Sequence, residues 1–349
     1  MASQVSGLIA TAFLAWVRAR ARGQSAVLVG LALVLLVAVA GLGLDGANAF
    51  SQRRNAQNAA DAAAMAGTNS LISQRKVNGP DSAVYSTIAG YLQDHGIDLS
   101  QHPWNAHYVD KDEASIRTIL DNNTQVPANA RGVVVDLSYN FNTLFMPVLG
   151  RSSLAVSGQA TAMFGPAASY GGSDLVPFTI SQAGLADLLD QNGGQDAEIN
   201  TIKLGEGNFG SLIFNPDLSS STVGSDCPSS PYVDSLSYYW CNGSPKYPVS
   251  IGENLWIKPG SVATSLETEI NTRRNTIMIV PIFSGNVGTG GNSQSTIVGF
   301  VAVRLTAINL TGPVEERGFT VDYIGNVTTT GAFNPNGVDG GVYAINLVK

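Results

Sequence analysis

The feature that most restricts this chain is an apolar run near its N-terminus. Residues 26–44 have the sequence AVLVGLALVLLVAVAGLGL, and no charged side chain occurs from Gln24 to Leu44. At 1.5 Å per residue, a helix over this run is about 28 Å long, close to the thickness of the hydrocarbon core of a bilayer. The run also lacks the polar face that a helix in a soluble core usually keeps. We therefore expect one transmembrane helix over residues 25–44.

The charges that flank the run predict its orientation. Three basic residues precede it: Arg18, Arg20 and Arg22. Asp45 follows it, and the next basic residues are Arg53 and Arg54. The positive-inside bias therefore favours a cytoplasmic N-terminal segment over residues 1–24, with the C-terminal bulk outside the cytoplasm. The expected location is the cell membrane, as a single-pass protein whose first partner is the lipid bilayer.

Two other interpretations of the run remain open. Ala47–Asn48–Ala49 has the small-x-small form of a signal peptidase site, and cleavage there would release a soluble protein beginning at Phe50. The run is longer than the apolar core of an ordinary signal, however, and its helical pattern continues past the site. The second alternative is a buried helix of a globular domain, against which the missing polar face argues.

The charge beyond the run excludes one class of partner. The 349-residue chain has a net charge of −7. Beyond residue 44 it carries 16 basic and 26 acidic side chains, without a basic cluster. A surface this negative repels phosphate backbones, so no nucleic-acid partner is expected. The low share of charged residues, 13%, and the 38 glycines are typical of β-rich exported proteins.

Two cysteines, Cys227 and Cys241, flank a turn-rich segment. In an exported region we expect them to form one disulfide, which would contribute roughly 3 kcal/mol in the chain-entropy model. Two unpaired thiols are the alternative. A zinc site would need more soft ligands than these.

Beyond the membrane, the helix is expected to continue as an Ala-rich extension over residues 45–75. Small residues recur on one face at helical spacing: Ala56, Ala59, Ala60, Ala63, Ala64 and Gly67. Such a stripe lets another helix or a sheet approach closely. The spacing alone fits equally well an ordinary Ala-rich helix packed on its own domain.

Several motifs around the span follow one pattern. An Arg-Gly pair at 22–23 precedes the span, GLGLD closes it at 41–45, and RRNAQNAADAAAMAG follows at 53–67. Residues 131–166 add a second stretch, which contains GVVVD, LFMPVLG and LAVSGQATA. Together these motifs resemble the TadE/TadG-like family of Flp pilus-assembly proteins. The resemblance implies a membrane-anchored accessory or minor pilin-like component of a tight-adherence system, whose partners are other Flp/Tad pilus or assembly subunits.

The resemblance also raises the question of processing. Prepilin-like members of the wider family are cut after a glycine near the membrane and carry a glutamate five residues into the mature helix. Gly23 is the candidate cleavage position here, and Gln24 would become the first residue. The fifth residue is then Leu28 rather than a glutamate. We therefore expect an unprocessed anchor.

The rest of the chain predicts an α+β fold in two parts. The first, over residues 76–167, is a pilin-like small α/β layer. Its expected elements are a helix over 81–96, strands over 104–109, 133–141 and 153–164, and a turn over 143–150. A linker over 165–172 leads into a β-rich extracytoplasmic domain over 168–349. Its expected strands cover 175–180, 276–283, 296–307 and 319–327, with helices over 181–192 and 261–274.

No cluster of side chains predicts catalysis, a cofactor or a metal. His95, His102 and His107 share no helix face, and a loop is expected there. Residues 133–140 resemble the metal motif of von Willebrand A domains only superficially, because the strand continues through it. The glycines of 287–292 lack the Lys-Ser/Thr pair of a phosphate loop. The acidic residues of 110–113 and the Asn/Asp/Gly run of 334–341 are expected to be solvated turns.

A rival function is a tethered or secreted envelope module that binds or hydrolyses glycans. Such a module needs convergent carboxylates or an exposed aromatic groove. Tyr238, Tyr239 and Trp240 are the one aromatic cluster that suggests a groove. Core packing beside Cys241 is the alternative for this cluster. The favoured prediction is therefore a protein that is not an enzyme and acts through protein contacts.

Overall fold

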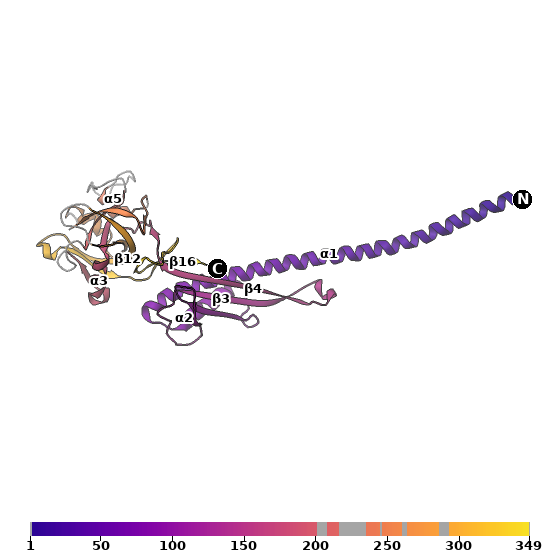
Figure 1. The fold of residues 1–349 in the computed structure, drawn as a ribbon, viewed down its shortest axis with the longest axis horizontal. Helices are drawn as coiled ribbons and strands as arrows, with labels where there is room; N and C mark the ends of the chain where they lie inside the picture. The colour runs from indigo at the N-terminus through magenta and orange to yellow at the C-terminus, as the bar shows by residue number, and fades with distance from the viewer. Residues whose placement is uncertain are drawn as a thin grey trace.

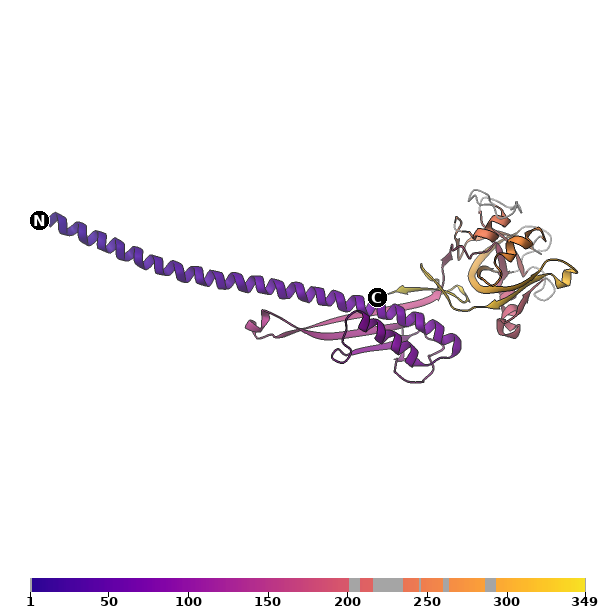
Figure 2. The same cartoon turned by 180° about the vertical axis from the view of Figure 1, so that it is seen from behind.

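A single helix, α1 (Ala2–Val77), joins the apolar run to the folded part of the chain. The computed structural model describes residues 2–200, 208–215, 235–244, 246–259, 264–285 and 293–348. In Figures 1 and 2 the N-terminal half of α1 extends alone, and its C-terminal half lies along a sheet. The fold is α+β with a β-rich C-terminal region, which confirms the predicted class.

The first sheet packs against the C-terminal half of α1. Helix α2 (Asp81–Asp94) follows α1 in the chain. The first strands of the sheet are β1 (Trp104–Val109), β2 (Ser115–Thr118), β3 (Gly132–Asn142) and β4 (Ser153–Pro166). The predicted strands are confirmed, and the predicted turn contains the 3-10 helix η1 (Met146–Leu149). Helix α2 ends two residues earlier than predicted, and Gly96 follows with a φ of +77°, a left-handed conformation that glycine adopts without strain.

The end of the chain returns to this first sheet. Strands β14 (Val327–Thr329) and β16 (Val342–Leu347) complete it, in the order β14-β16-β4-β3-β1-β2. Strand β16 runs antiparallel to the C-terminal end of β4, with Tyr343 opposite Pro166. The domain boundary at residue 168 stays a prediction, but segments from both sides of it are hydrogen-bonded neighbours in one sheet.

The second sheet forms the β-rich part. Its order is β10-β8-β6-β11-β12-β13-β7, and β15 pairs with β12. These strands are β6 (Phe178–Ser181), β7 (Ala197–Ile199), β8 (Phe209–Ile213), β10 (Asn254–Pro259), β11 (Ile277–Phe283), β12 (Ser293–Asn309), β13 (Gly318–Tyr323) and β15 (Val338–Gly340). Two short strands, β5 (Ser169–Tyr170) and β9 (Val249–Ser250), form a separate two-stranded sheet. The predicted hairpin of β11 and β12 is confirmed, and the glycine run of 287–292 lies outside the described residues.

The helices of this part are short. They are α3 (Gln182–Asp190), α5 (Leu236–Asn242) and α6 (Glu267–Asn271), with 3-10 turns η2 (Asn192–Gly194), η3 (Thr264–Leu266) and η4 (Val314–Glu316). Ser181 was expected inside α3 but caps it, because its Oγ accepts the Gly184 N–H at 2.9 Å. The predicted strand over 319–327 ends at Tyr323, and the chain then crosses back to the first sheet as β14.

The small-residue stripe of α1 forms the contact with the first sheet. Its five alanines have no exposed surface and belong to one apolar core with residues of α2, β1, β3 and β4. Close approach also needs a glycine on the sheet, since a Cβ on Gly158 of β4 would lie 2.8 Å from the backbone N of Gln57. The chain's own sheet is therefore the element that packs closely on the stripe.

A larger side chain in the stripe is expected to force this contact apart. Ala60→Leu adds three carbons at a position with no exposed surface, so we expect it to lower the free energy of unfolding by about 1–3 kcal/mol. Ala62→Leu, at a partly exposed position of the same helix, is the matched control and should change it by less than about 0.5 kcal/mol. Denaturant unfolding of the detergent-solubilised chain measures both. Equal losses in the two variants would mean that the stripe is not the packed face.

Candidate functional site at the membrane-proximal end

The N-terminal half of α1 presents apolar side chains to its surroundings. Ten of its large apolar residues are 53–69% exposed: Val27, Leu28, Val29, Leu31, Leu33, Val34, Leu35, Leu36, Val37 and Val39. Among the described residues, the part of α1 from Val27 to Val77 is the one helix long and apolar enough to cross a membrane. This agrees with a single-pass membrane protein, and the orientation predicted from the flanking charges stays a prediction.

The β3–β4 hairpin ends beside the last turn of the apolar run. Figures 1 and 2 show this hairpin extending along α1 toward its N-terminus. The hairpin closes through Thr143, whose N–H donates to the Ser152 carbonyl at 3.0 Å and whose hydroxyl donates to the Arg151 carbonyl at 2.9 Å. The residues between them, 144–150, form what we call the hairpin tip. Gly150 ends its 3-10 turn with a φ of +78°.

Asp45 of α1 holds the hairpin tip. Its side chain has no exposed surface. Its Oδ1 accepts the Leu144 N–H at 2.8 Å, and its Oδ2 accepts those of Phe145 at 2.8 Å and Met146 at 2.7 Å. Phe145 is the N-cap and Met146 the first residue of η1, so their N–H groups have no partner within the turn. Hydrogen bonds to a carboxylate are about twice as strong as neutral ones.

A second contact lies one helical turn away. The Phe145 ring packs on Gly41, where a Cβ would lie 2.5 Å from the ring Cγ. Asp45 and Gly41 therefore fix the tip level with the end of the apolar run. The sequence signals for this contact were an acid directly after the span and the LFMPVLG segment. Nothing in the sequence linked the two, because they are about 100 positions apart.

The other predicted site residues fall in different places. The stripe Ala56, Ala59, Ala60, Ala63, Ala64 and Gly67 lies inside the chain, where Gly67 faces Ile88 of α2. Gly23 and Gln24 lie within α1, and processing between them stays a prediction. Cys241 lies in α5, and its predicted partner, Cys227, lies outside the described residues. The disulfide therefore also stays a prediction.

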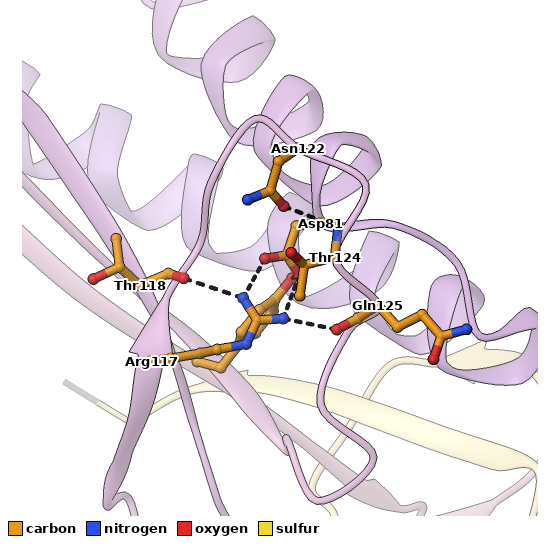
Figure 3. A network of polar contacts seen from close by, with 7 residues as sticks. Asp81, Arg117, Thr118, Asn122, Thr124 and Gln125 are labelled. Atoms are coloured by element: carbon orange, nitrogen blue, oxygen red, sulfur yellow. Dashed lines mark hydrogen bonds and ion pairs between the residues drawn. The ribbon is translucent and has the colours of Figure 1, made fainter.

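A second fully buried carboxylate is that of Asp81, in the first turn of α2. Figure 3 shows the guanidinium of Arg117 from β2 lying against its carboxylate. Arg117 Nη2 donates to Asp81 Oδ1 at 2.9 Å and to the Gln125 carbonyl at 2.7 Å. The Tyr108 hydroxyl donates to the same Oδ1 at 3.0 Å. The Asp81 and Ser82 N–H groups donate to the carbonyls of Thr124 and Asn122, which fixes the 119–126 loop on α2.

This cluster connects three elements of the first sheet region. Burial, together with the Asp81 charge and its hydrogen bond, raises the pKa of Tyr108 well above its usual range. The hydrogen bond to Asp81 raises the pKa of Arg117. Asp81 itself has no exposed surface. The Tyr108 hydroxyl and the Arg117 guanidinium both donate to the Asp81 carboxylate, so the cluster ties β1, β2 and α2 together.

The three histidines do not come together. The His95 ring contacts the Tyr91 carbonyl at 2.8 Å through Nδ1. His102 stacks on Tyr139, with 4.6 Å between ring centroids. His107 Nδ1 lies 3.9 Å from an Asp136 oxygen. Over the described parts of the chain, no three His, Cys, Asp or Glu residues form a group able to hold a metal ion.

The aromatic cluster of the rival function is buried. Tyr238, Tyr239 and Trp240 of α5 are 7%, 3% and 1% exposed. Tyr239 packs edge-on against Phe214, and Trp240 lies against Phe319. These rings are core residues of the β-rich part, as the alternative interpretation of the cluster expected. They form no exposed groove for a sugar ring.

One comparison with known proteins gives a match. Residues 23–70 match the family model of Flp pilus-assembly TadE/G-like proteins, named Tad. The matched segment begins at Gly23, contains the whole apolar run and ends just after the stripe. It confirms the resemblance seen in the N-terminal motifs. No curated protein and no solved structure matches the chain.

Removing the Asp45 charge is expected to loosen the hairpin tip. Asp45→Asn replaces one acceptor oxygen by an NH2 group that faces backbone N–H groups, so amide hydrogens of residues 144–146 should exchange faster. Hydrogen–deuterium exchange with mass spectrometry measures this rate. Asp112→Asn, the same change at a carboxylate in an exposed turn, should leave these amides unaffected. Unchanged exchange in Asp45→Asn would mean that the carboxylate does not hold the tip.

Removing Arg117 is expected to destabilise the first sheet. Arg117→Met leaves the buried Asp81 carboxylate with the Tyr108 hydroxyl but without its cation. The expected loss is about 3 kcal/mol, the lower end for one partner of a buried pair, because the Arg117 side chain is 30% exposed. Lys111→Met removes a partner of the exposed Lys111–Asp112 pair and should cost less than about 1 kcal/mol. Denaturant unfolding compares the two, and equal losses would contradict a structural role for Asp81.

Proposed function

We propose that this chain is a membrane-anchored accessory or minor pilin-like component of a Flp/Tad pilus assembly system, acting through protein contacts rather than catalysis. The observation that carries the proposal is the match of residues 23–70 to a pilus-assembly family. That segment coincides with the exposed apolar helix and with the stripe that attaches the first sheet to it. The family motif is therefore the part that anchors and supports the rest.

The architecture suits a protein that presents a domain away from a membrane. Helix α1 continues without interruption from the apolar run to Val77. The β-rich part lies beyond the C-terminal end of α1, on the side away from the N-terminus (Figures 1 and 2). Lys76, near the end of α1, donates to the Ile324 carbonyl, and its ammonium lies 5.9 Å from the centroid of the Tyr323 ring. In this proposal the β-rich part faces the cell exterior and meets other subunits.

The contacts with like helices fall on the apolar half of α1. The stripe of residues 56–67 is already covered by the chain's own sheet. Upstream, Cβ atoms added at Gly30 and Gly43 would meet nothing within 4 Å, so these positions leave room for a second helix. Association of helices in lipid depends on such close approach, since the hydrophobic effect gives no driving force there.

Two further parts of the proposal concern covalent chemistry. We propose that the chain keeps its N-terminal segment as a permanent anchor, because Leu28 stands where prepilins carry a glutamate. We also propose a Cys227–Cys241 disulfide, which suits an exported domain whose Cys241 sits beside the buried Trp240 of α5. Both fit a location outside the cytoplasm for the residues after the span.

Deletion of the gene from the native host is expected to reduce the number of pili on its cells and the adhesion of those cells to surfaces. Re-expression of the full chain should restore both, as counted by electron microscopy and a surface-adhesion assay. A chain with Leu35→Arg, which places a charge at the centre of the apolar run, should restore less, because a charge there costs roughly 2.5–3.5 kcal/mol of insertion free energy. Met65→Arg, on an exposed site outside the run, is its control. Normal pili and adhesion in the deletion strain would refute the proposed function.

A further inference from the structure

We propose that the hairpin tip is a second membrane-contacting element, which enters the boundary between headgroups and acyl chains beside the end of α1's apolar run. The inference rests on the proposed anchoring by α1 and adds a lipid-binding surface about 100 positions further along the chain. The ligand class is the phospholipid surface of the leaflet that faces the folded part.

The position of the tip is the first argument. Phe145 packs on Gly41, which lies inside the apolar run of residues 26–44, and Asp45 binds three consecutive N–H groups of the tip. If the run spans the bilayer, the tip therefore lies level with its last turn. That level is the interface of the bilayer, where apolar and polar groups meet.

The surface of the tip is the second argument. Val148 is 88% exposed and Leu144 is 76% exposed, although both are large and apolar. Leu42 and Leu44 of α1 are also exposed, so the apolar surface of the run continues onto the tip. The charged turn between β1 and β2, at residues 110–113, lies at the other end of the sheet, because Val109 pairs with Gly132 at the start of β3. Apolar residues thus gather at the end of the sheet nearest the run.

The backbone of the tip is the third argument. Unpaired N–H groups cost several kcal/mol in an apolar environment, so an inserted loop needs partners for them. Asp45 accepts the N–H groups of residues 144–146, and Pro147 has none. The Val148, Gly150 and Arg151 N–H groups donate to carbonyls of the tip itself. These N–H groups therefore already have protein partners, which lowers the cost of placing the loop in the interface.

A two-point attachment has a mechanical consequence. A single helix leaves the folded part free to rotate about the helix axis and to change its tilt. A second contact on one side of that axis fixes which face of the first sheet is turned toward the membrane. Arg151 is exposed and follows the tip directly. Its guanidinium extends this contact by binding lipid phosphates.

Fluorescence quenching at three positions tests the inference. A dansyl-bearing amino acid is placed at Val148, at Val34 or at Asp112 of the full chain, which is then reconstituted into vesicles of phosphatidylethanolamine and phosphatidylglycerol. All three side chains are well exposed, so the substitutions leave packing intact. Quenching by lipids with a nitroxide near the headgroup or deep in the acyl chain is compared with quenching by aqueous iodide.

We expect the probe at position 148 to be quenched most by the shallow nitroxide, the probe at 34 by the deep one, and the probe at 112 by iodide. Iodide quenching at 148 with lipid quenching at 34 would refute the tip contact and leave the anchor intact. Iodide quenching at 34 would refute the anchor itself. A probe at 148 shielded from all quenchers would mean that protein covers the tip, which also overturns the inference.

Discussion

The contact between the small-residue face of α1 and the β3–β4 hairpin is the interaction on which the remaining structure depends. Alanines with no exposed surface allow the helix axis to approach the sheet, and Gly158 lacks a side chain at a point where a Cβ would meet the helix backbone. Because the long strand β4 pairs with both β3 and β16, a helix fixed on it also positions the end of the chain. Membrane anchor, first sheet and β-rich part are thereby connected through one packed layer.

Asp45 plays a different part in the same assembly. Packing against a stripe of alanines is non-directional. Three hydrogen bonds from consecutive N–H groups to one carboxylate are directional, and they fix the hairpin at a single height on α1. The acid that directly follows the apolar run therefore fixes the hairpin tip beside the end of that run.

Local patterns in the sequence predicted most elements and the β11–β12 hairpin, but not the pairings between distant segments. The apolar run, the stripe and the strands over 133–141 and 153–164 follow from periodicity, because each pattern lies within one segment. The return of β16 to β4, the binding of residues 144–146 by Asp45 and the Arg117–Asp81 pair each join segments far apart in the sequence. Such partners are chosen by tertiary packing, and a single acid, arginine or short apolar strand carries no local sign of them.

The return of the chain to its first sheet also bears on how force passes through the molecule. A β-rich part joined only by a linker after β4 would be free to swing at that point. Here β14 and β16 are hydrogen-bonded into the sheet that covers α1, and Lys76 at the end of α1 contacts the Ile324 carbonyl between the two parts. A pull on the β-rich part is therefore carried by strands and helix together. Because α1 has no break between Val77 and the apolar run, that load reaches the membrane through a continuous helix.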